Sequence, residues 1–398
     1  MLNSRDKFKL LRAIFKTKFW KVNPKINLFL YKYLKKFKIR KVENKYIIHS
    51  HLPPINSLAY QRFVSEFLIK KSTAPSHAQI GITNSCPMKC DFCYNQDRKG
   101  KLISTEQILE TINELKGMGV IWLGLTGGEP LMNPDLVEIV ASIGDSVCSK
   151  LFTTGFGLTN ELTRDLKSAG LDYVSISLDD WRKDKYDQIR NFQGAYKVAL
   201  KAIELLKKNN IHVSVSAVFP RYMIENNKLE KFINFLIEQE VDEAWLSEVK
   251  PSCRKYWNSK HVITEKERQL LVDIQDEYNK KDDITINYLG HFEGKEHFGC
   301  AAGNRMIYID SYGEMSPCVF TPISFGNIKD FPLSVLFAEM SSNFSTEDKC
   351  FINKNYMNLE KFCKDDLPLS REDTLKMMEE VEFNNLSEFF KLFKGEDK

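Results

Sequence analysis

Three cysteines lie close together in one short stretch of the chain. Cys86, Cys90 and Cys93 fall within eight residues, spaced four apart and then three apart. Thiolates are soft ligands, and soft ligands in a tight group bind iron–sulfur clusters, zinc or copper(I). A [4Fe–4S] cluster normally takes four thiolates, so a loop that supplies three leaves one iron open to a substrate or cofactor. A structural zinc site is the alternative for this loop taken alone.

A second motif follows the cysteine loop after a distance typical of one βαβ unit. Residues 79–83 have the character of a strand and lead into the loop. A second strand-like segment, 120–125, ends in Thr126-Gly127-Gly128-Glu129-Pro130. A cysteine loop after one strand and a Gly-Gly-Glu-Pro sequence after the next resembles the radical S-adenosylmethionine (SAM) superfamily.

This resemblance implies a set of cofactors and a type of reaction. Cys86, Cys90 and Cys93 would hold a [4Fe–4S] cluster whose open iron binds the amino and carboxylate groups of SAM. Reductive cleavage of SAM would give methionine and a 5′-deoxyadenosyl radical, which takes a hydrogen atom from the substrate. A ferredoxin or flavodoxin would supply the electron. The cofactor performs the chemistry, and the protein orients it and excludes competing reactions.

The same resemblance assigns roles to residues near the cysteines. Phe92 occupies a position where the family has an aromatic side chain, which would shield the cluster. Gly127 and Gly128 have no side chains, so their backbone can approach a ligand closely. In the family this turn binds the methionyl ammonium group, with Glu129 fixing the turn and Pro130 completing the motif.

Further candidates follow the later strands. Alternation along 173–178 places Ser177 and Asp179 on one face. The resemblance implies that Ser177 and Arg190 contact the SAM carboxylate, which a guanidinium fork matches, and that Asp179 lies near the ribose or the substrate. Thr153, at the end of the third strand, is a further cofactor-binding candidate. A surface or helix-capping role is the alternative for these side chains.

The elements that must position these residues begin at residue 78, where strand-like and helical segments start to alternate. Such alternation predicts a parallel sheet with crossover helices. We expect strands at 79–83, 120–125, 147–153, 173–178, 212–219 and 243–249. Six such units close part of a barrel, and in these barrels the active site lies at the C-terminal ends of the strands. The predicted fold is therefore α/β, a partial (βα)6 barrel of the TIM type, and the motifs above fall at the expected end.

Beyond residue 250 the alternation stops. We expect a helix over 265–280, a strand over 284–288 and a hairpin that turns at 311–313. The cysteines of this region resemble those of the SPASM/twitch extensions, which carry auxiliary [4Fe–4S] clusters. The implied ligands of one auxiliary cluster are Cys300, Cys318, Cys350 and Cys363. The late Cys-x2-Cys pair of a full SPASM domain is missing, so one auxiliary cluster is expected rather than two. Zinc at these four positions, or a cluster held by three of them with an open iron, are the alternatives.

The N-terminal segment differs from the rest of the chain in charge. Residues 1–42 hold fourteen basic residues and one acidic residue, a net +13, which leaves −9 for the remainder because the whole chain carries +4. Two apolar stripes at helical spacing run through it; they consist of Phe8, Leu11, Phe15 and Phe19 with Trp20, and of Ile26, Phe29, Leu30, Tyr33, Leu34 and Phe37. Such stripes either lie on an anionic membrane surface or pack on the acidic body or on a partner. Nucleic acid is not expected, since no known nucleic-acid module accompanies the segment.

Four regions follow from these patterns. They are a basic amphipathic arm with its lead-in (1–77), the partial barrel (78–250), a small α+β auxiliary-cluster domain (251–365) and a helical tail (366–398). The chain contains nine cysteines but shows no secretory signal and no apolar run long enough to span a membrane. A reducing cytoplasm is therefore expected. Peripheral contact at the inner membrane surface applies if residues 1–41 lie on a membrane and do not pack on the body or on a partner.

The predicted function is that of a radical SAM enzyme acting on a peptide or protein, because relatives with auxiliary clusters commonly modify such substrates. The basic arm favours the alternative of a lipid or membrane-associated small molecule. A non-catalytic iron–sulfur protein for electron transfer or sensing would keep the cysteines. It would, however, give no reason for the sequence from Gly127 to Pro130.

Overall fold

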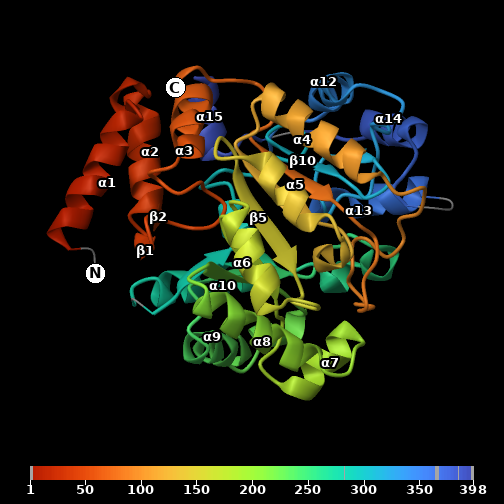
Figure 1. Cartoon of the computed structure of the whole chain (residues 1–398). Coiled ribbons are helices and arrows are strands. Elements are labelled where there is room, and N and C mark those ends of the chain that lie inside the picture. Colours follow the sequence, from red (N-terminus) through yellow and green to blue (C-terminus); the bar gives the residue numbers. More distant parts are fainter. Residues whose placement is uncertain (1–2, 282, 364–366, 384, 396–398) are drawn as a thin grey trace.

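A single curved sheet organises the molecule (Figure 1). The computed structural model describes residues 3–281, 283–363, 367–383 and 385–395. Its sheet has nine strands in the order β11-β10-β3-β4-β5-β6-β7-β8-β9. The strands are β3 (His77–Gly81), β4 (Trp122–Thr126), β5 (Cys148–Thr153), β6 (Tyr173–Ser177), β7 (His212–Phe219), β8 (Glu243–Glu248), β9 (Thr285–Tyr288), β10 (Met306–Ile309) and β11 (Met315–Ser316). The six strands expected from the sequence are confirmed as β3 to β8, each parallel to the one before it.

The part of the chain after residue 250 completes both edges of this sheet. β9 pairs in parallel with β8 at one edge. At the other edge β10 pairs in parallel with β3, and β11 turns back antiparallel to β10. The expected hairpin is therefore present, and it extends the barrel sheet instead of forming a sheet of its own.

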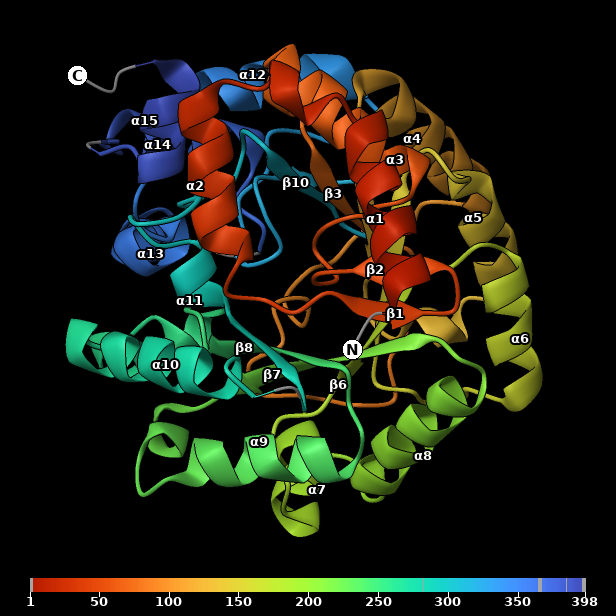
Figure 2. The same ribbon diagram turned by 90° about the vertical axis from the view of Figure 1, so that its left-hand side faces the viewer.

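Helices cover the outside of the curved sheet (Figure 2). They are α4 (Thr105–Met118), α5 (Leu136–Ile143), α6 (Asn160–Ser168), α7 (Lys183–Arg190), α8 (Ala195–Lys208), α9 (Lys228–Glu238) and α10 (Glu265–Tyr278). α4 begins as predicted with a capping box, in which Ser104 and Gln107 each accept a hydrogen bond from the other's backbone N–H. It ends at Gly119, whose φ of +111° favours glycine. The apolar faces of these helices and the sheet form the main core.

The N-terminal elements cover the end of the barrel where the strands begin (Figure 2). They are α1 (Ser4–Lys16), the 3-10 turn Phe19–Lys21, α2 (Pro24–Leu34), the hairpin of β1 (Arg40–Val42) and β2 (Lys45–Ile47), and α3 (Leu58–Arg62), which continues as a π-helix over Phe63–Ile69. Glu243 lies buried at this end and accepts hydrogen bonds from the backbone of Ser50 and from His212 Nε2. Burial raises the pKa of Glu243, but the bond from His212 and the charge of Lys150 outweigh burial and hold this pKa at about 2.

The two apolar stripes of the arm have different environments. In α2 the side chains of Ile26, Phe29 and Tyr33 are buried, and Phe29 packs on Phe298 and Phe389 at ring distances of 5.6 and 5.5 Å. Packing on the body is thus confirmed for this stripe. The stripe of α1 is exposed to solvent.

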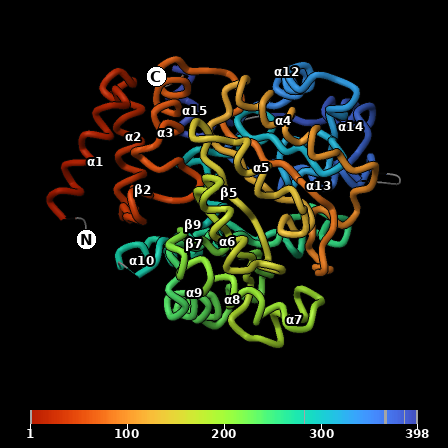
Figure 3. Tube along the Cα trace, in the orientation of Figure 1, coloured from red at the N-terminus to blue at the C-terminus, as the bar shows by residue number. Residues whose placement is uncertain are grey.

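C-terminal helices follow the barrel, and the last of them returns to the start of the chain (Figure 3). They are α11 (Leu289–Phe292), α12 (Leu333–Asn343), α13 (Phe351–Phe362), α14 (Arg371–Glu379) and α15 (Glu388–Lys394). The last of them, α15, packs beside α2 and buries three phenylalanines there. Positions 366, 384 and 396–398 of the predicted tail lie outside the described residues. Among the described residues, none of the helices combines the length and apolar character that a membrane crossing requires.

Candidate active site

The cysteine loop is tied by backbone hydrogen bonds to the turn at the end of β4. Gly128 N donates to Thr83 O at 2.7 Å, and Glu129 N donates to Ser85 O at 2.7 Å. These two bonds join the two sequence motifs across neighbouring parallel strands. The position of the first cysteine therefore depends on the conformation of the diglycine turn.

Only glycine permits this approach between the two segments. A Cβ atom at Gly128 would lie less than 3.0 Å from Ser85 O, and one at Gly127 would lie equally close to Thr83 O. Gly127 also has a φ of +128°, a conformation that side chains disfavour. The glycines are thus required for the packing of the loop itself, and both also line the cavity described below.

Hydrogen bonds to the Glu129 side chain hold the diglycine turn in place. This side chain is fully buried. One carboxylate oxygen accepts from Thr153 Oγ1 and from Leu131 N at 3.1 Å. The other accepts from Thr154 N at 2.7 Å and from Thr154 Oγ1. Burial raises the pKa of Glu129, and these four hydrogen bonds offset part of that rise. Thr153 faces the cavity, and its hydroxyl group is engaged with Glu129.

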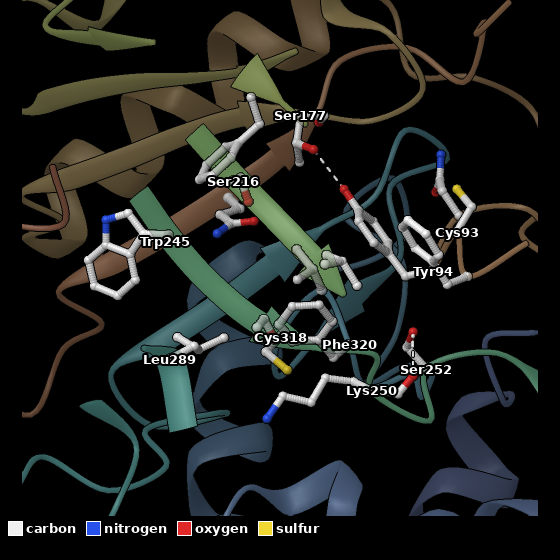
Figure 4. A pocket seen from close by; sticks show the side chains of 18 of the residues that line it. Cys93, Tyr94, Ser177, Ser216, Trp245, Lys250, Ser252, Leu289, Cys318 and Phe320 are labelled. Atoms are coloured by element: carbon white, nitrogen blue, oxygen red, sulfur yellow. Dashed lines mark hydrogen bonds between the residues drawn. The ribbon is translucent and has the colours of Figure 1, made fainter. Parts of the chain in front are cut away.

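A cavity of about 610 Å³ opens at the C-terminal ends of the strands (Figure 4). Its size lies within the range of about 300–1,000 Å³ that is usual for small-molecule sites. One wall carries the thiols of Cys86, Cys90 and Cys93. The remaining cysteines on its wall come from the C-terminal region and are Cys300, Cys318 and Cys350. Two groups of three thiols therefore face the same space.

The donor set of the first group fits an iron–sulfur cluster. The three thiols come from one loop and share the cavity wall with the diglycine turn. Burial raises the pKa of Cys93 to about 12. Such a thiol needs a bound cation to be held as a thiolate, which is what cluster iron supplies. Within the described ranges, no three His, Cys, Asp or Glu side chains are grouped around the position of a single metal ion.

Arg190 lies directly behind the cysteine loop. Its guanidinium group is 3.5 Å from Cys90 Sγ and is paired with the Asp179 carboxylate. It also lies over the ring of Phe92, at 5.7 Å from the ring centroid. Its Nε is buried and has no hydrogen-bond partner among the described residues. Arg190 and Phe92 face the cavity.

The other predicted residues divide between the cavity wall and its support. Ser177 lines the cavity. Asp179 is fully buried behind the wall, where it accepts from Val218 N at 2.9 Å and pairs with Arg190. Pro130 is buried and begins a short 3-10 turn, so it shapes the turn and does not face the cavity.

The auxiliary cysteines are not brought together as four. Cys300, Cys318 and Cys350 line the same cavity, and backbone pairing of Cys300 with Glu347 brings Cys300 to the segment that leads to Cys350. Cys350 is the N-cap residue of α13, whereas Cys363 is its C-cap residue. At about 1.5 Å per residue, a helix of 12 residues separates these two thiols. Cys363 Sγ accepts instead from Arg254 Nη2 at 3.1 Å.

Several cavity residues escaped sequence reasoning. Lys250 is buried, pairs with Glu248 at 2.8 Å and lies 3.8 Å from Glu293. Lys250 and Glu293 line the cavity close to the auxiliary cysteines. A signal for Lys250 was present, since it lies just after β8 at the active end of the barrel. Glu293 carries no such signal because it comes from a loop after α11.

Two further wall residues lie on the barrel strands themselves (Figure 4). Ser216 of β7 sits opposite Ser177 of β6 in the sheet register, and the alternation of serines in β7 could have revealed it. Trp245 of β8 lines the same cavity. Its indole N–H donates to Glu243, so the ring is held in one orientation.

A second, apolar cavity of about 150 Å³ lies beneath α2 and α15. His51, Phe292 and Met306 line both cavities. The remaining walls are largely aromatic, with side chains from the N-terminal arm and from α15. The large cavity at the C-terminal ends of the strands thus adjoins a smaller apolar cavity, which lies towards the opposite end of the barrel.

Two protein families match parts of this chain. Residues 80–236 match the radical SAM superfamily, and residues 300–365 match an iron–sulfur cluster-binding domain, SPASM. The AdoMet-dependent heme synthase of Methanosarcina barkeri is 26% identical over 67% of this chain and 82% of its own length. The PqqA peptide cyclase of Ruegeria pomeroyi is 30% identical over 42% of this chain and 45% of its own.

Solved structures show the same fold at low sequence identity. Streptococcus suis SuiB bound to S-adenosylmethionine superposes with a TM-score of 0.57 and 16% identity, over 75% of this chain and 78% of SuiB. SuiB bound to precursor peptide SuiA also gives 0.57 and 16% identity, over 82% and 80%. The predicted α/β partial barrel is confirmed by these likenesses.

Proposed function

The chain belongs to the radical SAM superfamily and is an enzyme of the SPASM type, and from this premise we propose that its substrate is a peptide or a protein side chain. Its cofactors are a SAM-binding [4Fe–4S] cluster, SAM itself and an auxiliary iron–sulfur centre. The named activities of two relatives differ, since one is a heme synthase and the other a peptide cyclase. The peptide cyclase and the likeness to peptide-bound SuiB support a peptide substrate.

The observation that carries this proposal is the shared cavity. Cys86, Cys90 and Cys93 would hold the SAM-binding cluster on one wall, and Cys300, Cys318 and Cys350 would hold the auxiliary centre on the other. Reductive cleavage of SAM is the chemistry that a cluster held by the first three thiols would supply when bound. The cavity that both groups of thiols line has a volume of about 610 Å³, within the range usual for small-molecule sites.

The residues of this chain have distinct tasks in the proposed reaction. Arg190 and Ser177 both line the cavity, where they would bind the carboxylate of SAM. Asp179 holds the Arg190 fork in place. Glu129 keeps the diglycine turn against the cysteine loop. A dry, largely apolar wall around Trp245 and Phe292 would exclude water from the radical.

Three auxiliary thiols suggest a defined role for the second centre. A cluster held by Cys300, Cys318 and Cys350 would keep one iron open towards the cavity. Lys250 and Glu293 stand beside these thiols. We propose that this open position anchors the substrate, with Lys250 neutralising a negative charge there.

The primary test is SAM cleavage by the full chain. Protein reconstituted with iron and sulfide and reduced with dithionite should form 5′-deoxyadenosine, measured by chromatography with mass detection. Adding a peptide fraction from the source cells should raise the rate. Failure to form any 5′-deoxyadenosine with loaded clusters would overturn the proposal.

A lipid or membrane-associated small molecule is the second candidate substrate. The apolar cavity beneath α2 favours it, because an alkyl or isoprenoid chain could extend there past Phe292. A lipid extract from the same cells separates the two candidates. Stimulation by the extract alone would favour the lipid, and stimulation by the peptide fraction alone would favour the peptide.

A further inference from the structure

The outer face of α1 and the turn after it present large apolar side chains to solvent. Phe8 is 68% exposed, Leu11 55%, Phe15 58% and Trp20 55%. Together with Phe19 they form what we call the arm patch. The rings of Phe15, Phe19 and Trp20 pack on one another with centroids 5.8–6.1 Å apart. The helix α1 lies at the edge of the molecule (Figure 1), so these exposed apolar side chains are at its periphery.

The opposite face of α1 packs on the rest of the protein. Leu10 is buried against Tyr33 and Tyr46. Asp6 is buried too, where it accepts from Tyr46 Oη and pairs with Lys41 at 2.9 Å. The helix therefore presents the arm patch outward, and it is fixed in this orientation by α2, whose own stripe is buried.

Basic side chains surround the arm patch. The exposed cations of α1 and the following turn are Arg5, Lys7, Lys9, Arg12, Lys16, Lys18 and Lys21. Asp6 is the one acidic residue in the first 42 residues, and it points inward. The outer face of the arm is therefore positive as well as apolar.

We propose that the arm patch docks the enzyme on an anionic lipid bilayer. At about 1.5 Å per residue, the 13 residues of α1 cannot cross a bilayer, so the helix lies in the plane of the interface. Phe8, Leu11 and Phe15 would enter the acyl boundary, and Trp20 would sit at headgroup level. The flanking lysines would contact anionic headgroups. A protein partner would need a matching acidic and apolar face, whereas an anionic bilayer offers both features along the whole patch.

Vesicle flotation of the full chain tests this proposal without SAM or a reductant, so its result is independent of the proposed reaction. Vesicles of phosphatidylcholine with about one third phosphatidylglycerol should carry the protein upward, and vesicles of phosphatidylcholine alone should carry much less. Raising the salt concentration should weaken the binding. Equal flotation with both kinds of vesicle would overturn the proposal.

Surface variants test the two components separately. Phe15→Ser with Trp20→Ser should lower the vesicle affinity by about tenfold or more. The matched control is Val335→Ser with Met357→Ser, which removes equally exposed apolar groups from α12 and α13 and should leave the affinity unchanged. If the arm variant binds as tightly as the unchanged protein, the arm patch is not the docking surface.

Charge variants complete the test. Lys16→Gln with Lys18→Gln should lower the affinity by about fivefold per charge removed. Lys197→Gln with Lys208→Gln, on exposed positions of α8, is the control and should have no such effect. Equal losses from both pairs would indicate non-specific attraction and would contradict the proposal.

Trp20 supplies a direct readout of insertion. Its emission should shift to the blue on anionic vesicles, because a half-exposed indole would leave water. Trp20→Phe should keep most of the binding and lose this shift, although four other tryptophans remain in the chain. A shift that persists in Trp20→Phe would place the arm patch outside the interface.

Discussion

Two groups of thiols face the same cavity, and they are built in different ways. Cys86, Cys90 and Cys93 come from one loop of eight residues. The second group, Cys300, Cys318 and Cys350, comes from segments spread over fifty residues of the chain. The comparison teaches that a local motif keeps its geometry wherever the loop is supported, whereas a dispersed site exists only when the surrounding fold forms.

The supports of the two groups reflect this difference. The loop is fastened by two backbone hydrogen bonds to its neighbouring turn. Cys300 is instead paired with Glu347 by two reciprocal backbone bonds of 2.7 and 3.2 Å, which bring it to the segment that leads to Cys350. Loss of that pairing would separate the second group and leave the first group in place.

The largest effect is expected when one cysteine of each group is replaced and the two variants are compared. Cys86→Ala should abolish 5′-deoxyadenosine formation, because SAM would lose its cluster. Cys300→Ala should lose roughly four irons per chain and keep the SAM-cleaving cluster. Iron and sulfide assays together with 5′-deoxyadenosine measurement check this division. A Cys300→Ala protein without either cluster would mean that the two groups are not independent.

The next effect tests the local support of the first group. Gly128→Ala places a Cβ less than 3.0 Å from Ser85 O, so the loop must shift, at a cost of about 3 kcal/mol and with weaker loading of the first cluster. Gly117→Ala is the matched control, since its Cβ meets nothing within 4 Å on the exposed side of α4. It should stabilise the protein by up to about 1 kcal/mol. Urea unfolding monitored by circular dichroism measures both, and similar midpoints would contradict this view of the turn.

A somewhat smaller effect is expected from the buried carboxylate beneath the turn. Glu129→Gln places an amide N–H₂ where Thr154 donates two hydrogen bonds. We expect a loss of about 2 kcal/mol in unfolding free energy and weaker SAM binding, with the auxiliary iron retained. The matched control is Glu138→Gln, which makes the same change at an exposed position in the first turn of α5. An equal loss of iron from both centres in Glu129→Gln would show that its effect is not confined to the first group.

The smallest effect concerns the fourth auxiliary cysteine. Cys363→Ser should keep most of the auxiliary iron, because α13 separates this thiol from Cys350. Cys350→Ser, at the other end of the same helix, should lose it. Iron content and the electron paramagnetic resonance signal of the reduced protein distinguish the two variants. Equal losses would place Cys363 in the cluster after all.

Sequence reasoning succeeded where the signal was local. The six barrel strands and the capping box of Ser104 were predicted because strand character and capping depend on residues near one another. The cysteine loop and the Gly127-Gly128 turn were recognised as one site through their resemblance to the radical SAM superfamily, and their place at the C-terminal ends of parallel strands agreed with it. The exposure of one stripe of the arm and the burial of the other was not predictable, because both stripes have the same helical spacing.

Pairings across the fold also lay beyond the sequence. Arg190 and Asp179 were expected to contact the cofactor separately, and the structure pairs them with each other. Lys250 was missed although its position just after β8 was a signal, and Glu293 was missed because it comes from a loop after α11 that carries none. The strands β9 and β10 were expected in a separate auxiliary-cluster domain, whereas in the structure they extend the two edges of the barrel sheet.

The amino-acid sequence by itself determined the chemistry of this protein, because each of its two key motifs is local. The three thiols lie in one loop, and the glycine turn follows the next strand. Only the tertiary structure decided which distant thiols join the second group, which cation faces the first, and which stripe of the arm meets solvent. Those outcomes depend on burial and on contacts between segments remote in the chain, and the free energy of such contacts is set by the whole fold.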